Sequence, residues 1–476
     1  MTGYFGTDYD ADGNLTGDAG DTPLRGAVND PSPGEPWTEL GYARRLVRVY
    51  GSHLRYVPAW NQWLIWDGRR WAADMTGQAH RWMKAIARRL TTDAISHTDE
   101  ARRKALTSLA RRAESAAGVR GALGLAGTEK GVVAVPGDLD ADPFLLNCAN
   151  GTLDLRTMEL RGHDPADLIT KITGAAYDPC AEGPAFATFL ERVQPDPDMR
   201  AYLARLIGHA LEGTIREHIL PILHGEGANG KGTFTAAILT AIGEYADAAD
   251  PELLTARAFD AHPTGVADLF GLRLAVLHES DAGRKLAEGT VKRLTGGDRL
   301  KARRMREDFW HFDPSHTFMM LTNHKPLVTG QDEGIWRRLR LVPWDVVIPP
   351  DERDDRLGDQ LRLEADYVLT WLIRGYQDWR QAGLAEPGQV VKATAAYRAD
   401  SDDLGRFIEA RCITGPNFTA RSGELFAAWV KWAASEGAEP GSNKALTEQL
   451  HNRGFDTKRS RAGIIWHGIG LTSEDP

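Results

Sequence analysis

The stretch His218-Ile-Leu-Pro-Ile-Leu-His224 runs directly into Gly225-Glu-Gly-Ala-Asn-Gly-Lys-Gly-Thr233. The first part is an apolar run that predicts a buried strand, and residues 234–238 predict the start of a helix. Between them the spacing is G-x-x-x-x-G-K, in which glycines let backbone N–H groups turn inward towards a phosphate. We therefore predict a nucleoside triphosphate site, with Lys231 at the terminal phosphates; the alternative is a glycine turn with a solvated lysine. The predicted nucleotide-binding residues are Gly225, Gly227, Ala228, Asn229, Gly230, Lys231, Gly232 and Thr233.

The residue after the lysine departs from the usual pattern. Most such loops place Ser or Thr there, whose hydroxyl ligates magnesium. Here that position is Gly232, and the hydroxyl comes one residue later at Thr233. On a helix this shift rotates the side chain by about 100°. Either Thr233 reaches the metal from a differently wound loop, or water replaces the ligand.

Acidic residues follow a second predicted strand, Arg273-Leu-Ala-Val-Leu-His278. An ATPase of this class needs a carboxylate at the end of a neighbouring strand to hold magnesium and polarise water. Glu279 is the preferred catalytic carboxylate and magnesium ligand, with Asp281 as the alternative or as a helper. The competing interpretation is that these acids only cap the following helix.

A third strand, predicted over Thr317–Thr322, ends at Asn323. An asparagine at a strand tip can orient the attacking water, although such residues also form ordinary turns. Arg337 and Arg338 precede a further strand that begins at Leu339. Either arginine is a candidate arginine finger, and the alternative is pairing with local acids.

Positive charge gathers in one segment of an otherwise acidic chain. The net charge is −9, yet residues 284–306 contain nine basic and two acidic residues. A charge run is often only a solvated face, and nucleic-acid binding is the alternative. The basic residues of this segment are Arg284, Lys285, Lys292, Arg293, Arg299, Lys301, Arg303, Arg304 and Arg306.

Composition predicts a globular, cytoplasmic protein of two to four domains. The 476 residues are 42% hydrophobic and 26% charged, and no apolar run approaches the roughly 20 residues of a membrane span. The N-terminus lacks a signal-peptide pattern. The three cysteines form no Cys-x-x-Cys pair, so the sequence supports neither a zinc ribbon nor a disulfide framework.

Changes in composition and hydrophobic periodicity along the chain predict its domain boundaries. We expect a disordered leader over 1–35, an α+β domain over 36–180, an α/β ATPase domain with a parallel sheet over 181–350, a helical connector over 351–400 and a winged-helix-like module over 401–476. In the last segment, Lys458, Arg459 and Arg461 are the expected duplex contacts. Asp138, Asp140 and Asp142 lie in a Pro/Gly-rich loop rather than at strand ends, so we expect no primase domain.

The order of these motifs resembles that of the superfamily 3 helicases, in the branch of phage and plasmid primase-helicases related to the poxvirus one. The resemblance covers roughly residues 37–350. Besides the glycine loop and Glu279, it rests on Lys292-x-x-Thr-Gly-Gly-Asp298-x-x-x-x-Arg303, Phe312-x-Pro314, Thr322-Asn323 and Gly334-x-x-Arg337-Arg338, with Trp63-Leu-Ile-Trp-Asp-Gly68 and Leu146-Asn-x-x-Asn150-Gly-Thr-Leu-Asp154-Leu upstream.

The resemblance implies an AAA+-like ATPase that uses ATP and Mg²⁺, forms a hexameric ring and translocates on single-stranded DNA to unwind a fork. It implies a β-hairpin over Arg299–Phe312 that projects into the central channel. The candidate DNA contacts are Lys292, Lys301, Arg303, Arg304 and Arg306, and the candidate catalytic residues are Lys231, Glu279, Asp281, Asn323, Arg337 and Arg338.

Between the two arginines we favour Arg338 as the finger, with Arg337 pairing with Asp332 or Glu333. Expected partners are single-stranded and forked DNA, further copies of the chain and a separate primase or replication initiator, with no membrane. Two other functions stay open: a ring ATPase that packages or remodels another substrate, and an initiator that uses nucleotide only as an assembly switch.

Overall fold

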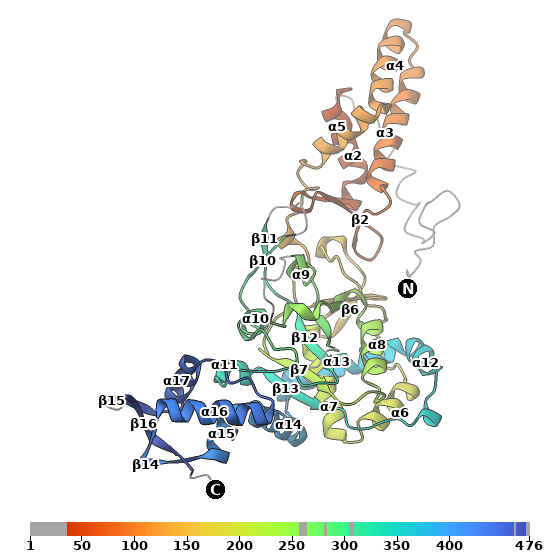
Figure 1. The fold of residues 1–476 in the computed structure, drawn as a ribbon. Helices are drawn as coiled ribbons and strands as arrows, with labels where there is room; N and C mark the ends of the chain where they lie inside the picture. The colour runs from red at the N-terminus through yellow and green to blue at the C-terminus, as the bar shows by residue number, and fades with distance from the viewer. Residues whose placement is uncertain (1–35, 257–263, 280–282, 304–308, 461–462, 473–476) are drawn as a thin grey trace.

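The computed structural model describes residues 36–256, 264–279, 283–303, 309–460 and 463–472. Its first part is a helical arm that stands away from the rest of the molecule (Figure 1). Thr38, Asp99 and Ser115 cap helices of this arm, each accepting a backbone N–H with its side chain. The helices are α2 (Glu39–Tyr50), α3 (Gln78–Ile95), α4 (Glu100–Glu114) and α5 (Ala116–Ala126).

A small antiparallel sheet lies at the base of the arm. It has three strands between residues 54 and 73. Asp67 accepts hydrogen bonds from the backbone of Arg69 and Arg70, and this turn brings a third strand back onto the second. The strands are β1 (Leu54–Val57), β2 (Gln62–Trp66) and β3 (Trp71–Ala73).

The centre of the molecule is a mixed α/β unit built on a five-stranded parallel sheet, which confirms the predicted fold class at this level. The strand order is β13-β7-β12-β9-β8. Every residue of β12 is buried, as expected for a parallel sheet covered on both faces. The strands are β7 (Leu220–His224), β8 (Ala246–Ala249), β9 (Leu274–Glu279), β12 (Thr317–Thr322) and β13 (Leu339–Pro343).

Helices cover both faces of the sheet (Figure 1). The first face packs against α6 (Pro184–Val193), α7 (Pro197–Gly208), α8 (Lys231–Ile242), α12 (Leu357–Leu363) and α13 (Ala365–Ala382). The second packs against α9 (Thr264–Ala267), α10 (Glu288–Leu294), α11 (Glu333–Trp336) and the antiparallel hairpin of β10 (Leu300–Ala302) and β11 (Trp310–Phe312). The segment expected to be a connector differs: α13 buries Val368, Leu372 and Tyr376 in the core of the first face.

Three strands before the sheet pair with one another, and the first two of them pack into the same core. They are β4 (Leu145–Cys148), β5 (Gly151–Asp154) and β6 (Glu159–Arg161), and a turn at Ala149 and Asn150 joins β4 to β5. Leu146 and Leu153 share the hydrophobic cluster of α7, α8 and α13. These strands therefore belong with the central unit, while the arm has a core of its own.

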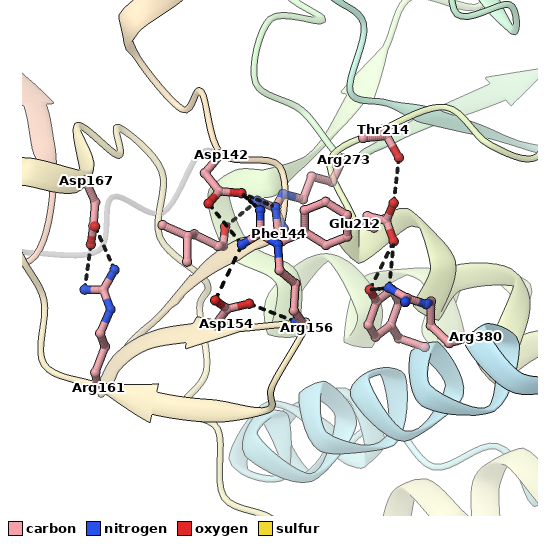
Figure 2. A network of polar contacts seen from close by, with 12 residues as sticks. Asp142, Phe144, Asp154, Arg156, Arg161, Asp167, Glu212, Thr214, Arg273 and Arg380 are labelled. Atoms are coloured by element: carbon pink, nitrogen blue, oxygen red, sulfur yellow. Dashed lines mark hydrogen bonds and ion pairs between the residues drawn. The ribbon is translucent and has the colours of Figure 1, made fainter.

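A polar network fastens β9 to this neighbourhood (Figure 2). Arg273, just before β9, is buried and donates through its two Nη atoms to the carbonyl oxygens of Leu145, at 2.5 Å, and Leu211. Its guanidinium carbon lies 4.5 Å from the centre of the Tyr245 ring. The strand that ends at Glu279 is thus anchored at its beginning.

The C-terminal part has a separate core around Phe407, Trp429, Trp432 and Trp466. It follows α14 (Gly388–Asp400), which packs along β13. Its elements are α15 (Asp403–Arg411), β14 (Cys412–Arg421), α16 (Ser422–Glu436), α17 (Asn443–Asn452), β15 (Asp456–Ser460) and β16 (Gly463–Leu471), with strand order β14-β16-β15. Among the helices that the structure describes, none combines the length and apolar character required to cross a bilayer.

Candidate functional site

The carboxyl ends of three neighbouring strands lie level with one another. Thr322 of β12 is paired with His224 of β7 on one side and with Glu279 of β9 on the other. The residues that follow these strands therefore meet at one edge of the sheet, which is where open α/β sheets bind their ligands. The glycine loop, Asn323 and the backbone of Glu279 all lie at this edge.

The glycine loop is held in a fixed shape by the segment after β13. Asn229 donates its side-chain amide to the carbonyl of Trp344 at 3.0 Å, and the Trp344 indole donates back to the carbonyl of Asn229 at 2.6 Å. Gly230 has a φ of 84° as it enters α8, a conformation that favours glycine. A Cβ atom at Gly225 would overlap the Trp344 carbonyl oxygen. These contacts pre-form the loop.

Lys231, the first residue of α8, is only 6% exposed. Its ammonium donates to the carbonyl of Gly225 at 2.5 Å and to Oδ1 of Asn323 at 3.3 Å. Burial lowers the pKa of Lys231. Two of the predicted catalytic residues, Lys231 and Asn323, are therefore hydrogen-bonded to each other near the carboxyl ends of β7 and β12.

Of the two predicted acids, one lies within a described element. Glu279 is the last residue of β9, with its backbone next to β12. Asp281 lies outside the described residues. The choice between them as the catalytic carboxylate stays a prediction.

Thr233 opens onto a cavity of about 680 Å³ on the α6 side of the loop. Ala228 and Gly230 line it with Thr233, and Phe189 and Ile348 add apolar surface. None of the lining residues comes from β9 or β12. Gly232 has no side chain, so the residue directly after Lys231 offers no hydroxyl to a metal. In the described residues, no three His, Cys, Asp or Glu side chains form a cluster that could hold a metal by themselves.

The two adjacent arginines have opposite surroundings. Arg338 is 9% exposed and donates to the Thr295 hydroxyl at 3.2 Å and to the carbonyl of Gly334 at 2.6 Å. Arg337 is exposed, and no described side chain pairs with it. Burial, followed by the neighbouring Arg337, lowers the pKa of Arg338. Arg337 is therefore the arginine that is free to reach another molecule, and Arg338 is held within its own chain.

The expected pairing of Arg337 with a local acid is wrong. Asp332 accepts both of its contacts from Lys292, at 2.8 and 2.9 Å, and Glu333 pairs with Arg398 at 3.0 Å. Lys292 is thereby bound within the chain, and its DNA contact stays a prediction.

The hairpin expected over residues 299–312 is confirmed as β10 paired with β11. Lys301 and Arg303 lie against Phe309, with the Lys301 ammonium 4.4 Å and the Arg303 guanidinium carbon 4.7 Å from the ring centre. Phe309 is 47% exposed. Arg304 and Arg306 lie outside the described residues. Two of the predicted DNA contacts therefore share an exposed aromatic ring that the sequence interpretation missed.

The base of the hairpin is fixed to the N-terminal sheet by aromatic side chains. Trp310 lies 5.0 Å from Phe270 and 6.0 Å from Trp60, measured between ring centres. The aromatic residues that meet here are far apart along the chain, so the sequence did not show that they are in contact. Among the residues expected in the C-terminal module, Lys458 and Arg459 are exposed on β15, and Arg461 lies outside the described residues.

Two family models match the chain. Residues 43–195 match the model described as "D5 N terminal like". Residues 223–338, which include the whole glycine loop and all three strand ends, match a "Family of unknown function (DUF5906)".

The chain is similar to curated proteins of several viruses. A "Putative helicase" of Acanthamoeba polyphaga mimivirus is 28% identical over 57% of this chain and 31% of its own length. A "Putative helicase" of Invertebrate iridescent virus 3 is 27% identical over 59% and 33%, and a "Putative primase" of African swine fever virus is 24% identical over 62% and 34%. The chain spans about a third of the length of these relatives.

Among solved structures, the apo C-terminal region of NrS-1 aligns over 88% of this chain and 96% of its own, at 11% identity and a TM-score of 0.47.

Proposed function

We propose that the chain is an ATP-dependent DNA helicase of the D5-like primase-helicase type that works as a ring on single-stranded DNA, because residues 43–195 match the "D5 N terminal like" model and its viral relatives are named putative helicases and primases. One observation carries the proposal: the buried Lys231 ammonium lies between the Gly225 carbonyl and Asn323, at the edge where the ends of β7, β12 and β9 are level. A buried cation with one side-chain and one backbone acceptor is placed to exchange the latter for a phosphate oxygen.

In this proposal the glycine loop and Lys231 hold the phosphates of ATP, and the cavity beside Thr233 takes the rest of the nucleotide. Its volume of about 680 Å³ lies within the usual range for small-molecule sites. Asn323 orients the attacking water, and the carboxylate of Glu279 polarises it. Bound Mg²⁺ would neutralise the β- and γ-phosphate oxygens. Glu279 and water would hold it, because Thr233 faces the cavity.

We propose Arg337 as the arginine finger. Its exposure lets it reach a nucleotide on a neighbouring subunit, where such a residue stabilises the charge of the transition state. A hexameric ring supplies that neighbour. The preference for Arg338 that the motif alone suggested is replaced, because its guanidinium is bound to Thr295 and Gly334.

Single-stranded DNA would contact the β10–β11 hairpin. An aromatic ring flanked by cations is a common arrangement for holding unpaired bases and phosphates, and Phe309 with Lys301 and Arg303 provides one. The C-terminal module has its elements in the order α15-β14-α16-α17-β15-β16, which is the order expected of a winged helix, and we propose that its β15–β16 hairpin contacts duplex DNA.

The test is ATP turnover by the purified chain with and without a single-stranded oligonucleotide. We expect turnover that the oligonucleotide increases several-fold, and that a Lys301→Ala/Arg303→Ala variant no longer shows this increase. Turnover that DNA leaves unchanged would favour a motor acting on another substrate. Oligonucleotide binding without turnover would favour an initiator that uses nucleotide as a switch.

A further inference from the structure

Helices α3 and α4 concentrate positive charge on a part of the chain that the proposed function does not use. Residues 78–114 contain nine Arg or Lys and four Asp or Glu residues, a net charge of +5 in a chain of net charge −9. The two helices pack against each other in the arm that stands away from the sheet (Figure 1). This positive charge is therefore displayed well away from the candidate nucleotide site.

Most of these basic side chains have no partner among the residues that the structure describes. Two of them do have an acidic partner: Arg89 pairs with Asp93 at 3.4 Å, and Arg112 lies 3.9 Å from Glu39. Six others are exposed and make no ion pair or side-chain hydrogen bond with any described residue. They are Lys84 and Arg88 on α3, and Arg102, Arg103, Lys104 and Arg111 on α4.

Helical spacing groups these cations on outer faces. Lys84 and Arg88 are four residues apart, and Lys104 and Arg111 are seven apart, so each pair lies on one side of its helix. The buried sides carry small and apolar residues such as Ala87, Leu90, Ala110 and Ala113. Thr91 donates to Glu114 at 2.8 Å and ties the two helices together. The cations are therefore presented by a rigid pair.

A structural role does not account for this arrangement. Like charges four residues apart destabilise a helix slightly instead of supporting it. Charge complementarity instead fits a polyanion, because each phosphate that a Lys or Arg neutralises releases a condensed counterion.

The chemistry of the face distinguishes double-stranded from single-stranded nucleic acid. Proteins that hold single strands add aromatic rings on which bases stack. The large apolar side chains exposed on these two helices are Ile95 and Leu109, and neither is aromatic. Trp82 is half-buried and stacks on Tyr50 at 4.6 Å. This face therefore offers contacts to phosphates only, whereas the β10–β11 hairpin also offers the aromatic ring of Phe309.

We propose that the outer faces of α3 and α4 bind the phosphate backbone of duplex DNA without regard to sequence. The proposal rests on the proposed function only for the identity of the duplex, the one that the helicase would unwind. An 18-residue helix is about 27 Å long, enough to follow roughly eight base pairs. The arm would hold the duplex while the hairpin holds the strand drawn from it.

The experiment compares two variants that remove the same charge from the same helices. Arg88→Gln/Arg111→Gln removes unpaired arginines, and Arg89→Gln/Arg112→Gln removes their paired neighbours. Binding of the full chain to a blunt fluorescent duplex and to a single-stranded oligonucleotide is followed by anisotropy over a range of NaCl concentrations, without nucleotide. ATP turnover without DNA and the thermal midpoint serve as folding controls.

We expect the Arg88/Arg111 variant to bind duplex about tenfold more weakly at roughly 0.1 M NaCl. Its plot of log affinity against log salt should flatten by nearly two units, roughly 0.9 for each phosphate that is no longer neutralised. The paired-neighbour variant should show less than half of this reduction in affinity, and single-strand binding should stay the same.

Unchanged duplex binding would overturn the proposal and point to a protein partner for this face. Equal reductions in both variants would overturn the assignment of this face, and an equal reduction for single strands would overturn the assignment to duplex. Because no nucleotide is present, a chain that hydrolyses no ATP would still give a clear result here.

Discussion

The strand edge and the helical arm both gather positive charge, but they treat it in opposite ways. Lys231 at the edge and Arg338 at the opposite, amino end of β13 are buried and donate to acceptors in their own chain. On the arm, Arg88 and Arg111 are exposed and unpaired with any described residue. A buried cation with oriented acceptors suits one ligand of fixed shape, whereas exposed cations suit a polyanion whose binding depends on salt.

The largest expected effect distinguishes the exposed Arg337 from the buried Arg338 beside it. Arg337→Ala should lower ATP turnover by roughly 10³-fold or more, because a finger's charge acts in the transition state. Arg338→Ala should instead lower the thermal midpoint, because it removes a buried side chain that donates to Gly334. Steady-state turnover and thermal unfolding of both variants check this.

Mixing tests whether Arg337 acts across a subunit boundary. Arg337→Ala and Lys231→Ala preparations, each inactive alone, should regain part of their turnover once mixed assemblies are demonstrated by mass. If exchange occurs and no activity returns, Arg337 does not act in trans. If Arg338→Ala complements instead, the two roles are reversed.

Lys231 gives the next largest effect. Lys231→Ala should reduce turnover by about 10²–10³-fold, the usual reduction when one pre-oriented electrostatic donor is removed. Duplex binding without nucleotide should be unaffected, because Lys231 lies in neither of the two proposed duplex contacts, the arm and the β15–β16 hairpin. Lys392→Ala, at an exposed lysine on α14, is the control. A Lys231→Ala variant that also bound duplex more weakly would contradict the assignment of nucleotide binding and duplex binding to separate regions.

The shape of the loop can be tested separately from its charge. Gly225→Ala should weaken ATP-analogue binding by about 1–3 kcal/mol, or roughly five- to 150-fold, because the new methyl group displaces Trp344 or the loop. Gly388→Ala, at the start of α14 and outside the loop, is the matched control, since a Cβ there meets nothing within 4 Å. Equal affinities, measured by calorimetry, would show that the Trp344 contact does not shape the site.

The last effect concerns the stability of the fold and lies at the opposite end of β12. His316 is 1% exposed, and burial lowers its pKa from 6.5 to about 4. Below pH 6.5 the unfolded chain takes up a proton that the folded chain excludes until about pH 4. The free energy of unfolding should therefore decrease by about 3 kcal/mol as the pH falls from 6.5 to about 4. Urea denaturation at neutral pH and inside this window should show a smaller difference for His316→Gln, and an identical difference would assign the effect to other groups.

The sequence predicted the strand edge well because each motif there combines an apolar run with the polar residue that follows it. Parallel strands bring such residues to one edge, so the meeting of Lys231 with Asn323 needed only the right strand order. The motif could not separate Arg337 from Arg338. Which of two adjacent residues is buried depends on Thr295, a partner distant in sequence.

The arm shows the same limit. Its helices were predictable from the composition of residues 79–126, but its unpaired cations were not. Whether Arg88 or Arg89 has an acid within reach depends on side-chain placement, and the two are neighbours in the sequence. The winding of the loop around Trp344 likewise depends on a contact between residues that are far apart along the chain.

Strand separation of a forked duplex tests the central claim most directly. The fork carries a fluorophore and a quencher at its junction, and the chain is given ATP and Mg²⁺. We predict that the chain separates the strands with ATP, that a non-hydrolysable analogue supports binding without separation, and that Lys231→Ala binds the fork without opening it. A wild-type chain that hydrolyses ATP and binds the fork, yet leaves it closed, would contradict the account.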